Sequence, residues 1–80
     1  MKILFFGQLR ELLNVTELQL DATPSDVSAL LEHLSAQNDQ WRQYLSSDSI
    51  LVAVNQTLSD KHCKLNEHDE VAFFPPVTGG

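Results

Sequence analysis

The stretch TPSDVSALLEHL, residues 23–34, decides the fold that this sequence predicts. Thr23 can cap the free backbone N–H groups at the start of a helix, Pro24 suits the first helical position, and Asp26 favours the positive end of the helix dipole. The apolar residues that follow recur at i, i+3, i+4 and i+7 and form one stripe: Val27, Leu30, Leu31 and Leu34. A helix with one apolar stripe must bury it, and we expect this helix to lie against a sheet.

Strand-like segments stand before this helix in the chain. Residues 2–6, with the sequence KILFF, favour a strand, and Gly7 ends it by allowing a change of direction. Residues 17–20 alternate polar and apolar side chains, which is typical of a half-buried strand. The simplest arrangement pairs these two strands with each other.

Strand-like segments also follow the helix. Residues 50–54 are apolar on both faces and therefore predict a central strand, and Asn55 and Gln56 supply a turn into a short strand near Thr57 and Leu58. Residues 70–74 form the last expected strand.

Two shorter helices complete the prediction. Leucines at helical spacing predict a short helix over residues 8–13, and Asn14 stands where the chain leaves it. A second short helix is expected around residues 39–45, with Trp41 and Leu45 on one side, closing an end of the core. This order of elements indicates an α+β fold in which one main helix packs across a mixed sheet, the ubiquitin-like β-grasp architecture. We expect a β-grasp domain over residues 1–74 and an extended tail over residues 75–80.

Composition excludes several classes of function. The chain has 80 residues, 42% of them hydrophobic, which suffices for one core and one domain. Its net charge of −6 repels phosphate backbones and anionic lipids, so we expect neither a nucleic acid nor a membrane as partner. The apolar runs are too short to span a bilayer. Cys63 is the single cysteine, which fits a reducing compartment, and we expect a cytoplasmic protein.

Most combinations of residues that could form a metal site or a catalytic site have little support in this sequence. Cys63, His62 and His68 provide at most three metal ligands, two of them adjacent, so we expect no metal site. A nucleophilic pair of Cys63 and His68 is conceivable, but an isolated cysteine in a small domain is more often inert packing or a surface residue. His33 is expected to be a solvated side chain. There is no glycine-rich phosphate loop, and we expect the chain itself to bind no cofactor.

The end of the chain has an unusual composition. Pro75 and Pro76 cannot continue the ladder of the preceding strand because neither has an N–H to donate, and both favour an extended backbone. Fully extended, residues 75–80 reach roughly 20 Å from the sheet. Gly79 and Gly80 present an α-carboxylate on a slim stem that another protein could thread through a narrow channel. The residues alone leave open whether this is a functional tail or a frayed terminus.

Three segments carry a resemblance to a known family. LFFGQLREL at residues 4–12, VNQTL at 54–58 and DEVAFFPPVTGG at 69–80 resemble the small, sulfur-carrying subunits of molybdopterin synthase, the MoaD-type sulfur carriers. The likeness covers the whole chain. A terminal Gly-Gly is shared with other ubiquitin-like proteins, whereas the complete FFPPVTGG ending is specific. The chain departs from the family at Asn14 and at residues 66–68, where glycines are common.

The resemblance implies a chemical role for the tail. An E1-like enzyme that uses ATP and magnesium adenylates Gly80, and sulfur from a persulfide donor converts it to a thiocarboxylate. Gly79 provides the slim stem, and Thr78 and Val77 thread with it into the partner. The large subunit of the synthase, in a heterotetramer of two small and two large subunits, transfers the sulfur to cyclic pyranopterin monophosphate. The chain is then no enzyme by itself, since the catalytic acids and bases belong to the large subunit.

The strand pattern independently indicates a partner surface. Lys2 and Glu70 mark the solvent side of the first and last strands, so Leu4, Phe6 and Phe74 should share the face away from the helix. Large apolar side chains on an uncovered face suggest an interface, unless the short helices or loops cover them.

Two alternatives remain open at this stage. The first is a related carrier that donates sulfur to thiamin or transfer RNA, or a modifier conjugated to lysines. The second is a β-grasp interaction module whose terminus does no chemistry, in which case removing Gly79 and Gly80 leaves every function intact.

Overall fold

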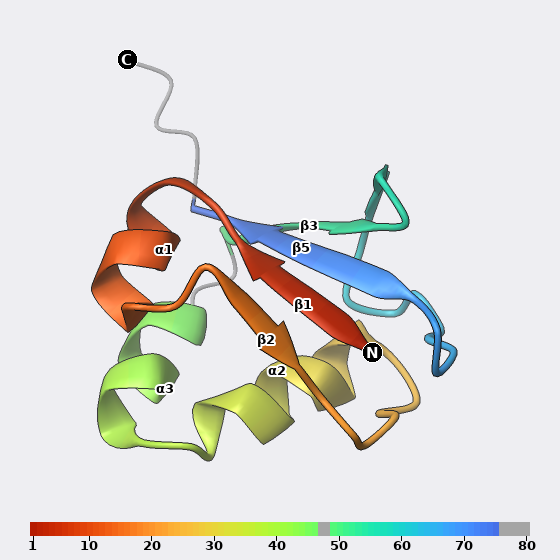
Figure 1. Cartoon of the computed structure of the whole chain (residues 1–80), viewed down its shortest axis with the longest axis horizontal. Coiled ribbons are helices and arrows are strands. Elements are labelled where there is room, and N and C mark those ends of the chain that lie inside the picture. The colour runs from red at the N-terminus through yellow and green to blue at the C-terminus, as the bar shows by residue number, and fades with distance from the viewer. Residues whose placement is uncertain (47–48, 76–80) are drawn as a thin grey trace.

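The computed structural model of the chain describes residues 1–46 and 49–75, and these form one five-stranded sheet with helices on one side (Figure 1). The elements in chain order are β1 (Lys2–Phe5), α1 (Gly7–Leu13), β2 (Glu17–Gln19), α2 (Val27–Ser35), α3 (Asp39–Leu45), β3 (Leu51–Val54), β4 (Thr57–Ser59) and β5 (Glu70–Phe74). The α+β class and the β-grasp arrangement predicted from the sequence are confirmed. The division into a domain over 1–74 and a tail over 75–80 stays a prediction.

The sheet is mixed, with strand order β2-β1-β5-β3-β4. β1 and β5 run parallel, while β1–β2, β3–β4 and β3–β5 are antiparallel. The predicted pairing of the first two strands is confirmed. β3 is an interior strand as expected, but the middle of the sheet is β5. Leu51 of β3 is 38% exposed on the side away from the helices, so one face of this strand is partly open.

The main helix starts later than its sequence predicts. Asp26, not Thr23, is the N-cap, and its side chain accepts a hydrogen bond of 2.8 Å from the N–H of Ala29. The residues before the helix pair instead with a distant segment: Asp26 forms an isolated bridge with Lys64, and the N–H of Leu65 donates to the carbonyl of Ser25. This tertiary pairing holds Asp26 in an extended conformation, so the helix begins at Val27 and not at Pro24.

The core lies between the sheet and the helices. Ile3, Phe5, Val71 and Phe73 are at most 1% exposed and face α2, whose apolar stripe is also buried, so the predicted strand parity is confirmed. The ring of Phe5 stacks on Phe73 and meets Trp41 of α3 edge to face, with a centroid distance of 5.7 Å. With Leu45 also buried, α3 closes one end of the core as predicted.

Left-handed backbone conformations mark three of the predicted turns. Gly7 has φ of 59° and Asn14 has φ of 58°, and asparagine tolerates this region. Asn55 and Gln56 both have positive φ, which suits a two-residue hairpin between β3 and β4. Residues 66–68 need no glycine, because their φ values are negative and Asp69 closes the turn with two hydrogen bonds to Asn66.

Candidate functional site

The side of the sheet opposite the helices, here called the outer face, carries a continuous group of apolar side chains. Strand register places on it Leu4, Phe6, Leu51, Ala53, Leu58, Ala72 and Phe74. Phe6 is 39% exposed and Leu58 is 72% exposed, while Leu4 and Phe74 are half-buried. In the part of the chain that the structure describes, no helix packs over these residues (Figure 1). An exposed apolar group of this size is typical of a protein interface.

Phe6 and Phe74 form the aromatic end of the outer face. Their rings stack with centroids 4.9 Å apart and an interplanar angle of 9°. The N–H of Phe6 donates to the carbonyl of Phe73 at 3.0 Å and so continues the parallel pairing of β1 with β5 by one step. The pair therefore lies at the point where β5 ends.

Pro75 is the last residue that the structure describes, and it packs against the corner between β1 and α1. A Cβ added to Gly7 would lie 3.0 Å from Cγ of Pro75, so the proline ring occupies the space that a side chain at position 7 would need. Val77, Thr78, Gly79 and Gly80 lie outside the described residues. Their predicted roles stay predictions.

Charged side chains form the opposite end of the outer face. Lys2 Nζ lies 3.6 Å from Glu17 Oε1 and 4.0 Å from Glu70 Oε2, and all three side chains are well exposed. Such exposed ion pairs contribute little to stability. They do give one end of the outer face a polar border.

Asp69 ties the start of β5 to the hairpin between β3 and β4. Its carboxylate accepts hydrogen bonds from the Asn55 side-chain amide at 2.9 Å and from the Asn66 N–H at 2.7 Å. These two bonds, the Asn55 bond first, lower the pKa of Asp69 below its usual value. Asn55 also accepts from the N–H of Glu70. The network fixes the hairpin beside the outer face.

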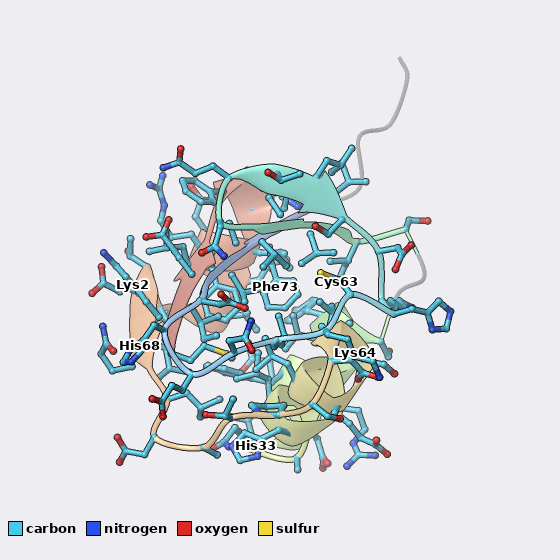
Figure 2. The ribbon with its side chains drawn as sticks, turned by 90° about the vertical axis from the view of Figure 1, so that its right-hand side faces the viewer. Lys2, His33, Cys63, Lys64, His68 and Phe73 are labelled. Atoms are coloured by element: carbon cyan, nitrogen blue, oxygen red, sulfur yellow. The ribbon has the colours of Figure 1, made fainter. Side chains whose placement is uncertain are left out.

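The structure separates the histidine and cysteine residues considered from the sequence. Cys63 packs beside the core and donates to the carbonyl of Lys64 at 3.6 Å, whereas His68 is exposed and lies 3.2 Å from Glu67 (Figure 2). The conceivable Cys63–His68 pair is therefore not formed. Within residues 1–46 and 49–75, no three His, Cys, Asp or Glu side chains gather as a metal-binding group. None of the described helices is long and apolar enough to cross a membrane.

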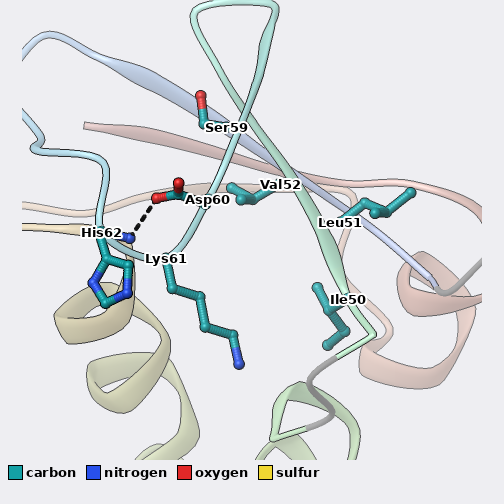
Figure 3. A pocket seen from close by; sticks show the side chains of 7 residues that line it. All are labelled: Ile50, Leu51, Val52, Ser59, Asp60, Lys61 and His62. Carbon is teal, nitrogen blue, oxygen red and sulfur yellow. Dashed lines mark hydrogen bonds between the residues drawn. The ribbon is translucent and has the colours of Figure 1, made fainter.

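A hollow of about 410 Å³ lies beside β3, where β4 is followed by a loop (Figure 3). Its lining combines apolar side chains of residues 50–52 with polar side chains of residues 59–62. The Asp60 carboxylate there accepts from the backbone N–H of His62 at 2.8 Å, which is a local turn contact. These groups do not converge as acid, base and nucleophile.

The sequence predicted Leu4, Phe6 and Phe74 on the outer face but missed its two other large side chains, Leu51 and Leu58. The signal was present, since a two-residue turn at Asn55 and Gln56 pairs Ala53 with Leu58 and so sets both on one face. Leu51 follows from the same alternation along β3.

Comparisons with known proteins show the family of this chain. The model of the ThiS family matches residues 3–80. The chain is 48% identical over 79 residues to the molybdopterin synthase sulfur carrier subunit of Escherichia coli (strain K12), a match that covers 99% of this chain and 98% of that protein.

Two solved structures show the same fold. The crystal structure of SAMP1 from Haloferax volcanii has a TM-score of 0.79 at 25% identity, covering 100% of this chain and 98% of that one. A chain in the complex of subunits 1 and 2 of molybdopterin-converting factor from Helicobacter pylori 26695 has a TM-score of 0.67 at 25% identity, covering 99% and 96%. With a family model that matches nearly all of its length, this chain belongs to the ThiS family.

Proposed function

We propose that this chain is the sulfur carrier subunit of a molybdopterin synthase and that it carries sulfur as a thiocarboxylate on Gly80. The observation that carries the proposal is the full-length identity of 48% with a protein of that name. The FFPPVTGG ending, residues 73–80, and the uncovered outer face next to it support the proposal. The lone Cys63 fits a cytoplasmic location, where thiols stay reduced.

Sulfur loading needs activation of Gly80, because a carboxylate is a poor electrophile until its oxygen becomes part of a good leaving group. In an E1-like enzyme the Gly80 carboxylate attacks the α-phosphorus of magnesium-bound ATP, and pyrophosphate leaves. A persulfide sulfur then attacks the acyl carbon, and AMP leaves. A thiol cleaves the resulting acyl disulfide and is itself oxidised to a disulfide, which leaves a thiocarboxylate on Gly80.

The large subunit is the proposed receiver of the loaded chain. The named complex of subunits 1 and 2 in the Helicobacter pylori relative supports a partner of this kind. We assign the outer face, with Leu4, Phe6 and Phe74, to this contact, because it lies directly beside the end of β5. In this proposal the tail, Val77 to Gly80, enters the active site of the large subunit. The catalytic acids and bases there deliver the sulfur to cyclic pyranopterin monophosphate, and two loaded carriers serve each dithiolene.

Mass spectrometry of the chain purified from cells that lack the large subunit tests this function, because a loaded carrier is not consumed there. Exchange of one oxygen for sulfur adds about 16 Da, and oxidation of Met1 or Cys63 adds the same mass, so the C-terminal peptide must be measured separately. We expect the added mass on that peptide, and we expect it to be absent when the activating enzyme is deleted.

Two results contradict the proposal. An unshifted C-terminal peptide in cells with an intact activating system favours the interaction module without terminal chemistry. A shifted peptide on a chain that does not bind the large subunit favours a related carrier for thiamin or transfer RNA, or a lysine-conjugated modifier.

A further inference from the structure

Two alanines form the floor of a groove on the outer face. Ala72 of β5 and Ala53 of β3 are directly paired, and the hollow above them has a volume of about 450 Å³. Phe6 and Phe74 line the hollow toward the end of β5, and Glu70 and Gln56 line it toward the hairpin, with Leu4 at the β1 side. The hollow is therefore apolar at its floor and along one wall, and polar along the other.

Strand register explains why the groove exists. Leu4, Ala72, Ala53 and Leu58 are successive partners across β1, β5, β3 and β4, and so form one row across the sheet. Side chains two residues away on the same strand stand on the same face, which puts Phe74 and Glu70 on either side of Ala72. The methyl groups of the alanines are far shorter than these neighbours. The two alanines in the middle of the row consequently form a depression, with Phe74 on one side and Glu70 on the other.

The acidic wall has capacity for another cation. Glu70 Oε2 is 4.0 Å from Lys2 Nζ, at the outer limit of an ion pair, and Lys2 lies closer to Glu17, at 3.6 Å. The Glu70 side chain is 36% exposed, so its carboxylate still faces solvent. The Gln56 side chain beside it adds an amide oxygen that can accept a hydrogen bond.

We propose that this groove receives one arginine or lysine side chain of the large subunit. The aliphatic stem lies over Ala53 and Ala72, and the cationic head meets Glu70 and Gln56, because such side chains combine an apolar stem with a charged end. The net charge of −6 favours a basic partner surface. The groove is continuous with the Phe6–Phe74 pair, where the chain leaves the sheet. An occupant from the large subunit therefore also sets the position from which the tail begins. This inference rests on the proposed function.

Calorimetric titration of the full chain with its large subunit, at low and high salt, tests the inference. We expect Glu70→Gln to weaken binding at low salt by at least about tenfold and to flatten the dependence of Kd on salt, as loss of an interfacial charge does. Glu67→Gln is the matched control, because it makes the same charge change on an exposed side chain outside the groove. We expect its Kd and salt dependence to equal those of the wild type.

A second variant, Ala72→Val, tests the floor without a change of charge. The added methyl groups fill the groove, and we expect weaker binding with an unchanged salt dependence. Trp41 packs on Phe5 on the other side of the sheet, so its fluorescence and the thermal midpoint show whether each variant keeps its core. The arginines and lysines of the large subunit are then substituted one at a time. The occupant is the residue whose substitution weakens binding to the wild-type chain but causes no further weakening with Glu70→Gln.

The outcomes separate this inference from the function on which it rests. Equal affinities for Glu70→Gln, Glu67→Gln and wild type overturn the cationic occupant, and if Ala72→Val alone weakens binding, the occupant is apolar. If the free chain dimerises, and Ala72→Val abolishes the dimer without changing the affinity for the large subunit, the groove binds a second copy of this chain. A wild-type chain that does not bind the large subunit overturns the proposed function as well.

Discussion

Phe6 and Phe74 are neighbours across two parallel strands, and their rings stack at a centroid distance of 4.9 Å with an angle of 9° between their planes. Phe6 lies between the end of β1 and the start of α1, and Phe74 is the last residue of β5. The stack therefore joins the outer face to the point from which the C-terminal segment continues. A partner that contacts this pair is also close to the start of the tail.

Replacing Phe74 should weaken docking on the large subunit. Burial of an aromatic side chain is worth roughly 1.5–3 kcal/mol, so we expect Phe74→Ala to raise Kd at least tenfold in calorimetry while the fold is kept. Leu12→Ala is a suitable control, because Leu12 is an apolar residue, 38% exposed, on α1 and away from the outer face. If both variants bind like the wild type, Phe74 is not in the interface.

Changing the length of the tail should abolish sulfur transfer. Deletion of Gly80 moves the carboxylate back by about 3.3 Å, and a misplacement of only about 1 Å can cost on the order of a hundredfold in rate. One added residue after Gly80 should inactivate as well. The thermal midpoint should hardly change, since the core cluster comprises residues between Ile3 and Phe73. Full molybdopterin synthesis by both variants is incompatible with the carrier mechanism.

Cys63 should be dispensable for loading, because the sulfur is proposed to reside on the acyl carbon of Gly80. Its thiol packs beside the core and donates to the Lys64 carbonyl. We expect Cys63→Ser to reach the same level of thiocarboxylate as the wild type, measured on the C-terminal peptide. Loss of loading in a folded variant would show that the thiol takes part.

Removing the cap of α2 should destabilise the fold. Asp26→Ala deletes the side-chain acceptor of the Ala29 N–H, which typically costs about 1 kcal/mol, or roughly 4–8 °C in thermal midpoint for a domain of this size. Glu32→Ala, an exposed position inside the same helix, serves as the control and should change the midpoint little. Thr23→Ala should be equally mild, because Thr23 is not the cap.

Stability should fall in acid partly through Asp69. The hydrogen bonds from Asn55 and Asn66 lower the pKa of this carboxyl in the folded state, so the ionised form stabilises the fold above the unfolded pKa of about 3.9. That stabilisation is lost as the pH falls through the folded pKa. We expect Asp69→Asn to be less stable than wild type at pH 7, by chemical denaturation, with the difference shrinking below pH ~4. A constant difference from pH 7 to pH 3 rules out this contribution.

The sequence by itself determined the elements whose signal is local. Alternation in β1 and β5 correctly predicted which side chains are buried, because the two faces of a strand follow from a period of two. The helical stripe after Asp26 and the turns at Asn14 and Asn55 depend on nearby residues only, and each occurs where it was expected. The FFPPVTGG ending at residues 73–80 indicated the proposed chemistry through its likeness to a family.

Only the tertiary structure decided what depends on distant segments. The start of α2 moved to Val27 because Ser25 and Asp26 pair with Lys64 and Leu65. The groove over Ala53 and Ala72 exists because register aligns two alanines between larger neighbours on the same face. Neither arrangement has a local signal, since the partners are separated by many residues and meet only when the sheet assembles.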